Sequence, residues 1–168
     1  MPSIGAILLL AVALGVGVSP ALAGDKPALG WVEKVRLYPG GLILQAKLDS
    51  GAEFCSLNAS NLTEFTRQGQ KWVKFQVANH LGQTKTFECQ VRRLAKIKRR
   101  GGGFHRRPVV KLGLCLGNLF EEVEVNLADR TGFIYPLLIG RNFMRGKLVI
   151  DPATMFTVEP QCPQGEHE

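Results

Sequence analysis

The sequence predicts an all-β protein, a closed barrel or a sandwich of short strands with at most one short helix. Two observations carry this prediction. Apolar residues alternate with polar ones over short segments such as 42–48 and 120–127, and turn residues separate these segments, as at Pro39-Gly40-Gly41. Helical periodicity is nearly absent. Because short strands without covering helices must bury their apolar faces against one another, a barrel or a sandwich follows.

The expected strands follow one another along the chain. The first covers 31–37 and the second 42–48, on either side of the proline-glycine turn. Segments 72–77 and 84–91 form a hairpin across 79–82. Further strands are expected at 108–116, at 120–127 and at 136–139, where a wholly apolar run fits a strand buried on both faces. A brief helical turn at 142–145 precedes short strands at 148–150 and 155–158.

The first 23 residues differ from the rest of the chain. They hold no Lys, Arg, Asp or Glu, and an apolar stretch leads to Pro20 and then to the small residues around Ala23. This pattern is typical of a secretory signal peptide, and a transmembrane anchor is the alternative. We therefore expect a signal peptide at 1–23, a linker at 24–29, one domain at 30–158 and a tail at 159–168, in an exported protein that is periplasmic or secreted and has no membrane anchor after cleavage.

The formal net charge of +7 is concentrated in one segment. Residues 92–107 hold eight Lys and Arg and no acidic residue, so the remainder has 21 − 8 = 13 basic and 14 acidic residues. A basic face spread over a domain would indicate nucleic-acid binding, and this distribution does not. The segment is expected to be a solvated, mobile hairpin or loop. Contact with an anionic surface or an acidic substrate is the alternative.

The four cysteines, Cys55, Cys89, Cys115 and Cys162, are widely and irregularly spaced without a CxxC pair. This spacing argues against a zinc ribbon and against a redox motif. One or two disulfides are expected in an oxidising compartment, with buried free thiols as the alternative for Cys89 and Cys115. The chain contains neither an HExxH motif nor a phosphate-binding GxxxxGK[ST] loop, so we expect no metal and no cofactor.

Two segments combine unusual polar residues with strongly apolar flanks. In the first, Asp49, Ser50 and Gly51 follow the apolar strand at 42–48. In the second, Gly140 and Arg141 follow the apolar run at 136–139. A carboxylate on a tight loop, with a neighbouring hydroxyl and a glycine that permits close backbone approach, suits aspartic-peptidase chemistry. An ordinary Asx turn at the end of a strand is the alternative for Asp49.

Taken together, these segments resemble the retropepsin-like aspartic proteases. The catalytic loop of that family matches Asp49-Ser50-Gly51-Ala52, and its second signature matches Leu138-Ile139-Gly140-Arg141-Asn142. The flap of the family is similar to the hairpin around Gly101, Gly102, Gly103 and Phe104. A narrower resemblance, over about residues 30–158, is to a bacterial family of the same fold catalogued as ATP-dependent zinc proteases. The resemblance implies a single-lobe, closed acid-protease barrel.

The resemblance also implies a function, an exported aspartic endopeptidase that cleaves a peptide or protein substrate. Such chemistry needs two carboxylates that share one proton and activate a water. Because the chain has one Asp-Ser-Gly motif, and Asp151 is followed by Pro152 and is expected to lie in a turn, the second carboxylate must be Asp49 of another copy in a homodimer. Ser50 would anchor the paired loops, and Glu53 would form an ion pair with Arg141.

One alternative to an enzyme is a β-barrel of the cell envelope that keeps the motif for structural reasons and binds a peptide or a partner protein. Another is a monomer in which Asp49 has no partner carboxylate and catalysis is absent. The intact Asp49 loop and the Gly140-Arg141-Asn142 segment favour the enzyme, because a lapsed enzyme is expected to lose its acid first.

Overall fold

A computed structural model describes residues 25–98 and 101–162. The expected signal peptide at 1–23 lies outside the described residues. Within the described ranges, no helix is long and apolar enough to cross a membrane.

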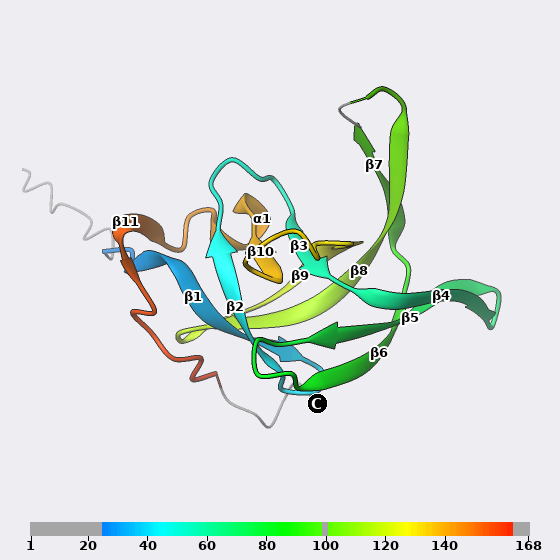
Figure 1. The fold of residues 1–168 in the computed structure, drawn as a ribbon. Coiled ribbons are helices and arrows are strands. Elements are labelled where there is room, and N and C mark those ends of the chain that lie inside the picture. The colour runs from blue at the N-terminus through cyan, green and yellow to red at the C-terminus, as the bar shows by residue number, and fades with distance from the viewer. Residues whose placement is uncertain (1–24, 99–100, 163–168) are drawn as a thin grey trace, which may run out of the picture.

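The chain forms eleven strands and one short helix within the described residues (Figure 1). In chain order these are β1 (Ala28–Tyr38), β2 (Ile43–Leu48), β3 (Cys55–Asn58), β4 (Ser60–Arg67), β5 (Gln70–Ala78), β6 (Thr84–Gln90), β7 (Arg93–Lys98), β8 (Phe104–Leu116), β9 (Leu119–Ala128), β10 (Leu137–Ile139), α1 (Arg141–Met144) and β11 (Val149–Met155). The all-β fold class with at most one short helix is therefore confirmed.

The larger sheet closes into a barrel. Its strand order is β11-β1-β2-β10-β3-β9-β8-β7, and β1 also pairs with β8, through Arg36 opposite Cys115 and Tyr38 opposite Gly113. The six strands from β1 through β2, β10, β3 and β9 to β8 thus form a ring, with β11 and β7 attached outside it. Closure removes the sheet edges within the ring, which is how a chain of short strands satisfies its backbone groups.

The core lies inside this ring and extends under a second sheet of order β4-β5-β6. Alternate residues of β2, such as Leu44 and Ala46, point inward and are fully buried. The second sheet contributes Val73, Phe75 and Phe87 to the same core. The two phenylalanine rings stack with their centroids 5.4 Å apart. One continuous core therefore joins the ring to the β4–β5–β6 sheet.

Several predicted elements are confirmed. The hairpin across residues 79–82 is β5 and β6, and the apolar run before Gly140 is β10, which lies between β2 and β3 in the sheet. Its residues Leu137 and Ile139 are fully buried. The expected helical turn is α1, which begins one residue earlier than predicted.

Two strands were not expected, and two expectations at the end of the domain are wrong. The strand expected at 155–158 is not formed, because β11 ends at Met155 and residues 156–158 belong to no strand. β3 has only four residues, and β4 is almost wholly exposed, so neither carries the period of a half-buried strand. The predicted turn at Asp151 lies within β11, and its carboxylate accepts a hydrogen bond from the backbone N–H of Ala153 (2.8 Å). Pro152 is tolerated there because β11 is an edge strand.

A disulfide and a buried carboxylate attach the C-terminal segment to the barrel. Cys115 of β8 is bonded to Cys162, whereas Cys55 and Cys89 are free and buried. Glu33 of β1 is fully buried and accepts hydrogen bonds from the backbone N–H groups of Gly30 (2.7 Å) and Thr157 (3.0 Å). Backbone donors thus satisfy a carboxylate that burial alone would strongly destabilise.

Candidate functional site

Asp49 lies where β2 leaves the barrel beside β10. Leu48 pairs with Ile139 in parallel strands, and the backbone N–H of Asp49 donates to the carbonyl of Ile139 (2.9 Å). The carboxylate accepts a hydrogen bond from the N–H of Gly51 (2.9 Å) and lies 3.7 Å from Nζ of Lys47. Its side chain is 28% exposed, so it is held in place and remains accessible.

The structure brings the two sequence motifs together. The backbone N–H groups of Arg141 and Asn142 donate to the carbonyls of Ala52 and Glu53, both at 2.9 Å. The guanidinium of Arg141 donates through Nη1 to the carbonyl of Ser50 (2.8 Å). The residues after Asp49 are therefore held by those after Gly140, about ninety positions later in the chain.

The expected ion pair between Glu53 and Arg141 is wrong. No oxygen of Glu53 lies within 4.0 Å of the Arg141 guanidinium, because that group is engaged with the backbone of the Asp49 loop. Arg141 therefore braces the loop through a carbonyl and not through a carboxylate.

Gly140 is required by a close approach of two backbones. A Cβ built on Gly140 would lie 2.6 Å from the carbonyl carbon of Phe54 and 2.7 Å from its oxygen. Its φ of −93° is open to any residue, so the space beside Phe54, and not the backbone angle, selects glycine.

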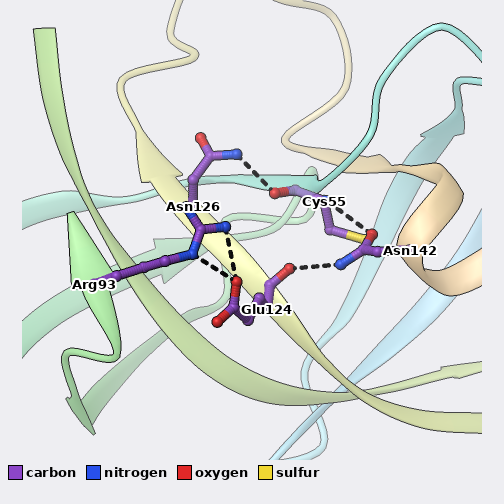
Figure 2. Close-up of polar contacts among 5 residues, drawn as sticks. All are labelled: Cys55, Arg93, Glu124, Asn126 and Asn142. Carbon is purple, nitrogen blue, oxygen red and sulfur yellow. Dashed lines mark hydrogen bonds and ion pairs between the residues drawn. The ribbon is translucent and has the colours of Figure 1, made fainter. Parts of the chain in front are cut away.

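A hydrogen-bond network adjoins the loop of residues 49–54, the Asp49 loop (Figure 2). The Asn142 amide oxygen accepts from the backbone N–H (3.1 Å) and the thiol (3.2 Å) of Cys55, and its Nδ2 donates to the carbonyl of Glu124 (2.9 Å). The Nδ2 of Asn126 donates to the carbonyl of Cys55 (2.8 Å). Asn142 was expected at the site from its motif, whereas Glu124 and Asn126 of β9 belong to no local motif.

The same network reaches the base of the β7–β8 hairpin. Arg93 of β7 forms an ion pair with Glu124, with Nη2 2.7 Å from Oε2. Its guanidinium also lies over the ring of Phe54, 4.6 Å from the centroid. Because Phe54 ends the loop that begins at Asp49, Arg93 connects the hairpin to the candidate site.

The expected flap is the tip of this hairpin. β7 and β8 pair up to Lys98 and Phe104, and the hairpin projects from the body of the barrel in Figure 1. Gly102 and Gly103 have positive φ angles of 92° and 74°, which glycine adopts without strain, and Phe104 is 67% exposed. Gly101 is also exposed, and residues 99–100 lie outside the described ranges. Closure of the hairpin over a substrate remains a prediction.

Two arginines near Asp49 were not expected at the site. Arg107 on β8 had been counted with the solvated basic segment, but its side chain is half-buried. Arg130, in the connection between β9 and β10, is 8% exposed. Burial holds the pKa of Arg130 below its usual range, the charge of Arg107 lowers this pKa further, and the charge of Asp49 raises it. The charge of Arg130 therefore interacts with the charges of both Arg107 and Asp49.

Among the described residues, no group of three or more His, Cys, Asp or Glu side chains could hold a metal ion. The chemistry that the site offers is that of one accessible carboxylate, with Nζ of Lys47 3.7 Å away and the charge of Arg130 interacting with it.

Cys55 makes the stability of the site depend on pH. Burial raises the pKa of its thiol from 9.0 to about 11, and a hydrogen bond from the Gly140 N–H opposes this shift. The unfolded chain therefore loses the thiol proton at lower pH than the folded chain does. We expect the free energy of unfolding to fall between pH 9 and 11, by up to about 3 kcal/mol for Cys55.

Denaturant unfolding at pH 8 and pH 10.5 checks this expectation. Cys55→Ala should show a smaller loss of stability at high pH than the wild type, since it lacks the titrating thiol. Cys89→Ala should show a similarly reduced loss, because burial also raises the pKa of the Cys89 thiol, in the β4–β5–β6 sheet, to about 11. Equal losses in wild type and Cys55→Ala would contradict the expectation.

Comparison with known proteins identifies the family. The model of the RimB-like family, described as "Retropepsin-like aspartic endopeptidase RimB", matches residues 28–161. The chain belongs to the RimB-like family. The expected retropepsin-like membership is thereby confirmed, and the narrower resemblance to the family catalogued as ATP-dependent zinc proteases is not.

Curated relatives carry a different name. A "Probable alpha-L-glutamate ligase" of Desulfotalea psychrophila is 32% identical over 126 residues, which are 73% of this chain and 26% of the relative. A protein of the same name from Shewanella halifaxensis is 32% identical over 121 residues, 70% of this chain and 26% of the relative. The chain thus spans about a quarter of the length of the curated relatives it matches.

A solved structure has the same fold. The crystal structure of Lpg0085 from Legionella pneumophila, a protein described as of unknown function, is 37% identical with a TM-score of 0.68, and the match covers 80% of this chain and all of that one.

These relatives correct the expected function. The expected function was that of an exported endopeptidase that cleaves peptides through a water activated by paired Asp49 carboxylates. This expectation is wrong, because the curated relatives are named for glutamate ligation. The membership of a RimB-like, endopeptidase-type enzyme family remains. Association into a homodimer stays a prediction.

Proposed function

We propose that this chain is an enzyme domain that acts on α-linked glutamate chains, with the Asp49 loop as its site. Two kinds of finding support this proposal: the reaction named for the longer relatives, and the charge around Asp49. The proposed class of substrates is thus narrower than the peptides in general that the sequence motifs alone suggested.

The relatives supply the link to glutamate. They contain a segment similar to this chain within a protein about four times as long as the matched part. A domain joined to a ligase meets the substrate or the product of that ligase at a high effective concentration. The similarity to part of a glutamate ligase therefore favours a glutamate chain as the substrate of this domain.

The observation that carries the proposal is the excess of positive charge at the site. Lys47 lies 3.7 Å from Asp49, and the charges of Arg107 and Arg130 act on each other close by. Lys47 and Arg130 thus act on the Asp49 carboxylate, and Arg107 adds a third positive charge next to Arg130. Such a region attracts a polyanionic chain and disfavours a neutral or basic peptide.

For the reaction, the family description supports aspartic-type hydrolysis. Directed at a glutamate chain, this reaction shortens what a ligase lengthens. Asp49 is the carboxylate at the loop that the retropepsin-like motif marks, and the cations around it hold the substrate.

The test is a comparison of three substrates with the purified chain. A peptide that carries an α-linked hexaglutamate tail should be shortened, as followed by mass spectrometry. The same peptide with γ-linked glutamates, or with hexaglutamine, should be shortened at least about tenfold more slowly, since charge-assisted contacts or the backbone geometry are lost. Equal rates on hexaglutamine, or no change in any tail, would overturn the proposal.

A further inference from the structure

We propose that Arg107 and Arg130 form a carboxylate-binding subsite that holds one glutamate side chain of the substrate beside Asp49. This proposal deepens the function proposed above and rests on it. It assigns the choice of an acidic side chain to two residues outside both sequence motifs.

The sheet register places a row of side chains on the outer face of the barrel. Lys47 pairs with Leu138, Leu138 with Ser56, and Ser56 with Asn126, across β2, β10, β3 and β9. Paired residues of neighbouring strands point to the same face of a sheet. Asp49 lies two residues beyond Lys47 and therefore shares this face.

Arg107 joins the row from β8. Asn126 pairs with Val109, and Arg107 lies two residues earlier on the same strand, so it shares the outer face. Its Nη1 makes only a long contact of 3.5 Å with Oδ1 of Asn126, and its Nε is buried without a hydrogen-bond partner. A guanidinium with a buried, unpaired donor is poorly satisfied by the protein alone.

Arg130 faces the same region from the connection after β9. Its backbone N–H donates to Oδ1 of Asn58 (2.7 Å), and its guanidinium stacks over the ring of Phe133, 4.4 Å from the centroid. The Nε makes a long contact of 3.5 Å with the carbonyl of Tyr135. These contacts orient the guanidinium of Arg130. Among the described residues, no acidic side chain forms an ion pair within 4.0 Å with Arg107 or Arg130.

The positive charges of Arg107 and Arg130 repel each other. Asp49 offsets this repulsion only in part, because the same carboxylate also lies beside Lys47. A carboxylate placed between the two guanidinium groups would receive charge-assisted hydrogen bonds from both and pair the buried donor of Arg107. A glutamate side chain bound there brings the adjoining backbone of the substrate next to Asp49.

Asn126, which contacts Arg107, is held in its orientation by other hydrogen bonds. Oδ1 of Asn126 accepts from the hydroxyl of Ser56 (3.1 Å), and its Nδ2 donates to the carbonyl of Cys55. Asn126 therefore cannot rotate to offer Arg107 a better contact without losing two hydrogen bonds. The arginine remains available to a ligand.

The first test measures affinity for hexaglutamate and hexaglutamine peptides by fluorescence anisotropy. Arg107→Gln should weaken binding of hexaglutamate at least tenfold and leave binding of hexaglutamine unchanged. Arg130→Lys, which keeps the charge but not the planar fork, should lose part of the discrimination. Arg67→Gln is the matched control, because it removes one exposed positive charge from β4, where Arg67 pairs with Glu88.

The second measurement separates this proposal from the function on which it rests. The side-chain Nε–H signals of the arginines are followed by NMR while glutarate, a dicarboxylate of the length of glutamate, is added. Signals of Arg107 and Arg130 that move together support the subsite whether or not any chain is cleaved. Suppose that hexaglutamate binds and is shortened, but glutarate moves neither arginine signal and both variants bind hexaglutamate as tightly as the wild type. The subsite is then wrong and the proposed function stands.

Discussion

Asp49→Asn should slow turnover of an α-linked glutamate chain at least about a hundredfold and at the same time tighten its binding. The amide keeps an oxygen that can accept the hydrogen bond from Gly51, so the loop geometry is retained. It cannot take up a proton as a carboxylate does, and loss of a general base costs about 10²–10⁴-fold in rate. Binding should improve because a negative charge next to Lys47 no longer opposes the acidic substrate.

The two opposite changes make this substitution informative. Rates are measured by mass spectrometry and affinity by anisotropy, with thermal unfolding as the check that the fold is intact. A variant that still shortens the chain at the wild-type rate contradicts a catalytic role for Asp49. Weaker binding of the substrate would show instead that Asp49 holds the site together, which is the role of an ordinary turn residue.

Gly140→Ala should be among the most destabilising single substitutions in the barrel. The added Cβ would lie 2.6 Å from the backbone of Phe54, and the hydrogen bonds from Arg141 and Asn142 to Ala52 and Glu53 keep the two segments from moving apart. Overpacking against the main chain costs about 3 kcal/mol. Denaturant unfolding measures this loss.

Gly132→Ala is the matched control. A Cβ at Gly132 would meet nothing within 4 Å, and this residue has no positive φ. The control should therefore change stability by less than about 0.5 kcal/mol, or stabilise slightly by restricting the unfolded chain. Similar unfolding curves for the two variants would mean that the Asp49 loop yields easily and that glycine is not required at position 140.

The all-β class could be predicted because it rests on local patterns. Alternation in 42–48 and 84–91 follows from the period of two of a half-buried strand. The apolar run before Gly140 also predicted a strand, although in β10 only Leu137 and Ile139 are buried and Leu138 is partly buried. Where the pattern is weak, prediction failed. β4 exposes nearly all of its side chains, and β11 continues through Pro152 only because it lies at an edge.

The two halves of the site could likewise be named in advance, since each is a contiguous run of residues. Their connection could not be derived in detail. Arg141 was expected to reach Glu53, but folding directs its guanidinium to the carbonyl of Ser50, and no sequence pattern encodes which acceptor is nearer.

By itself, the sequence determined the class of fold, the Asp49 and Gly140 segments and the family they resemble, because these depend on residues close together in the chain. Only the tertiary structure decided what surrounds Asp49. Arg107 and Arg130 come from β8 and from the connection after β9, and Asn126 comes from β9, so their juxtaposition depends on the order and register of strands far apart in sequence. From the sequence, the excess positive charge lies in the basic segment 92–107, and Arg107 was counted as one of its solvated residues. In the structure the Nε of Arg107 is buried and its Nη1 contacts Asn126, so this arginine belongs to the proposed subsite.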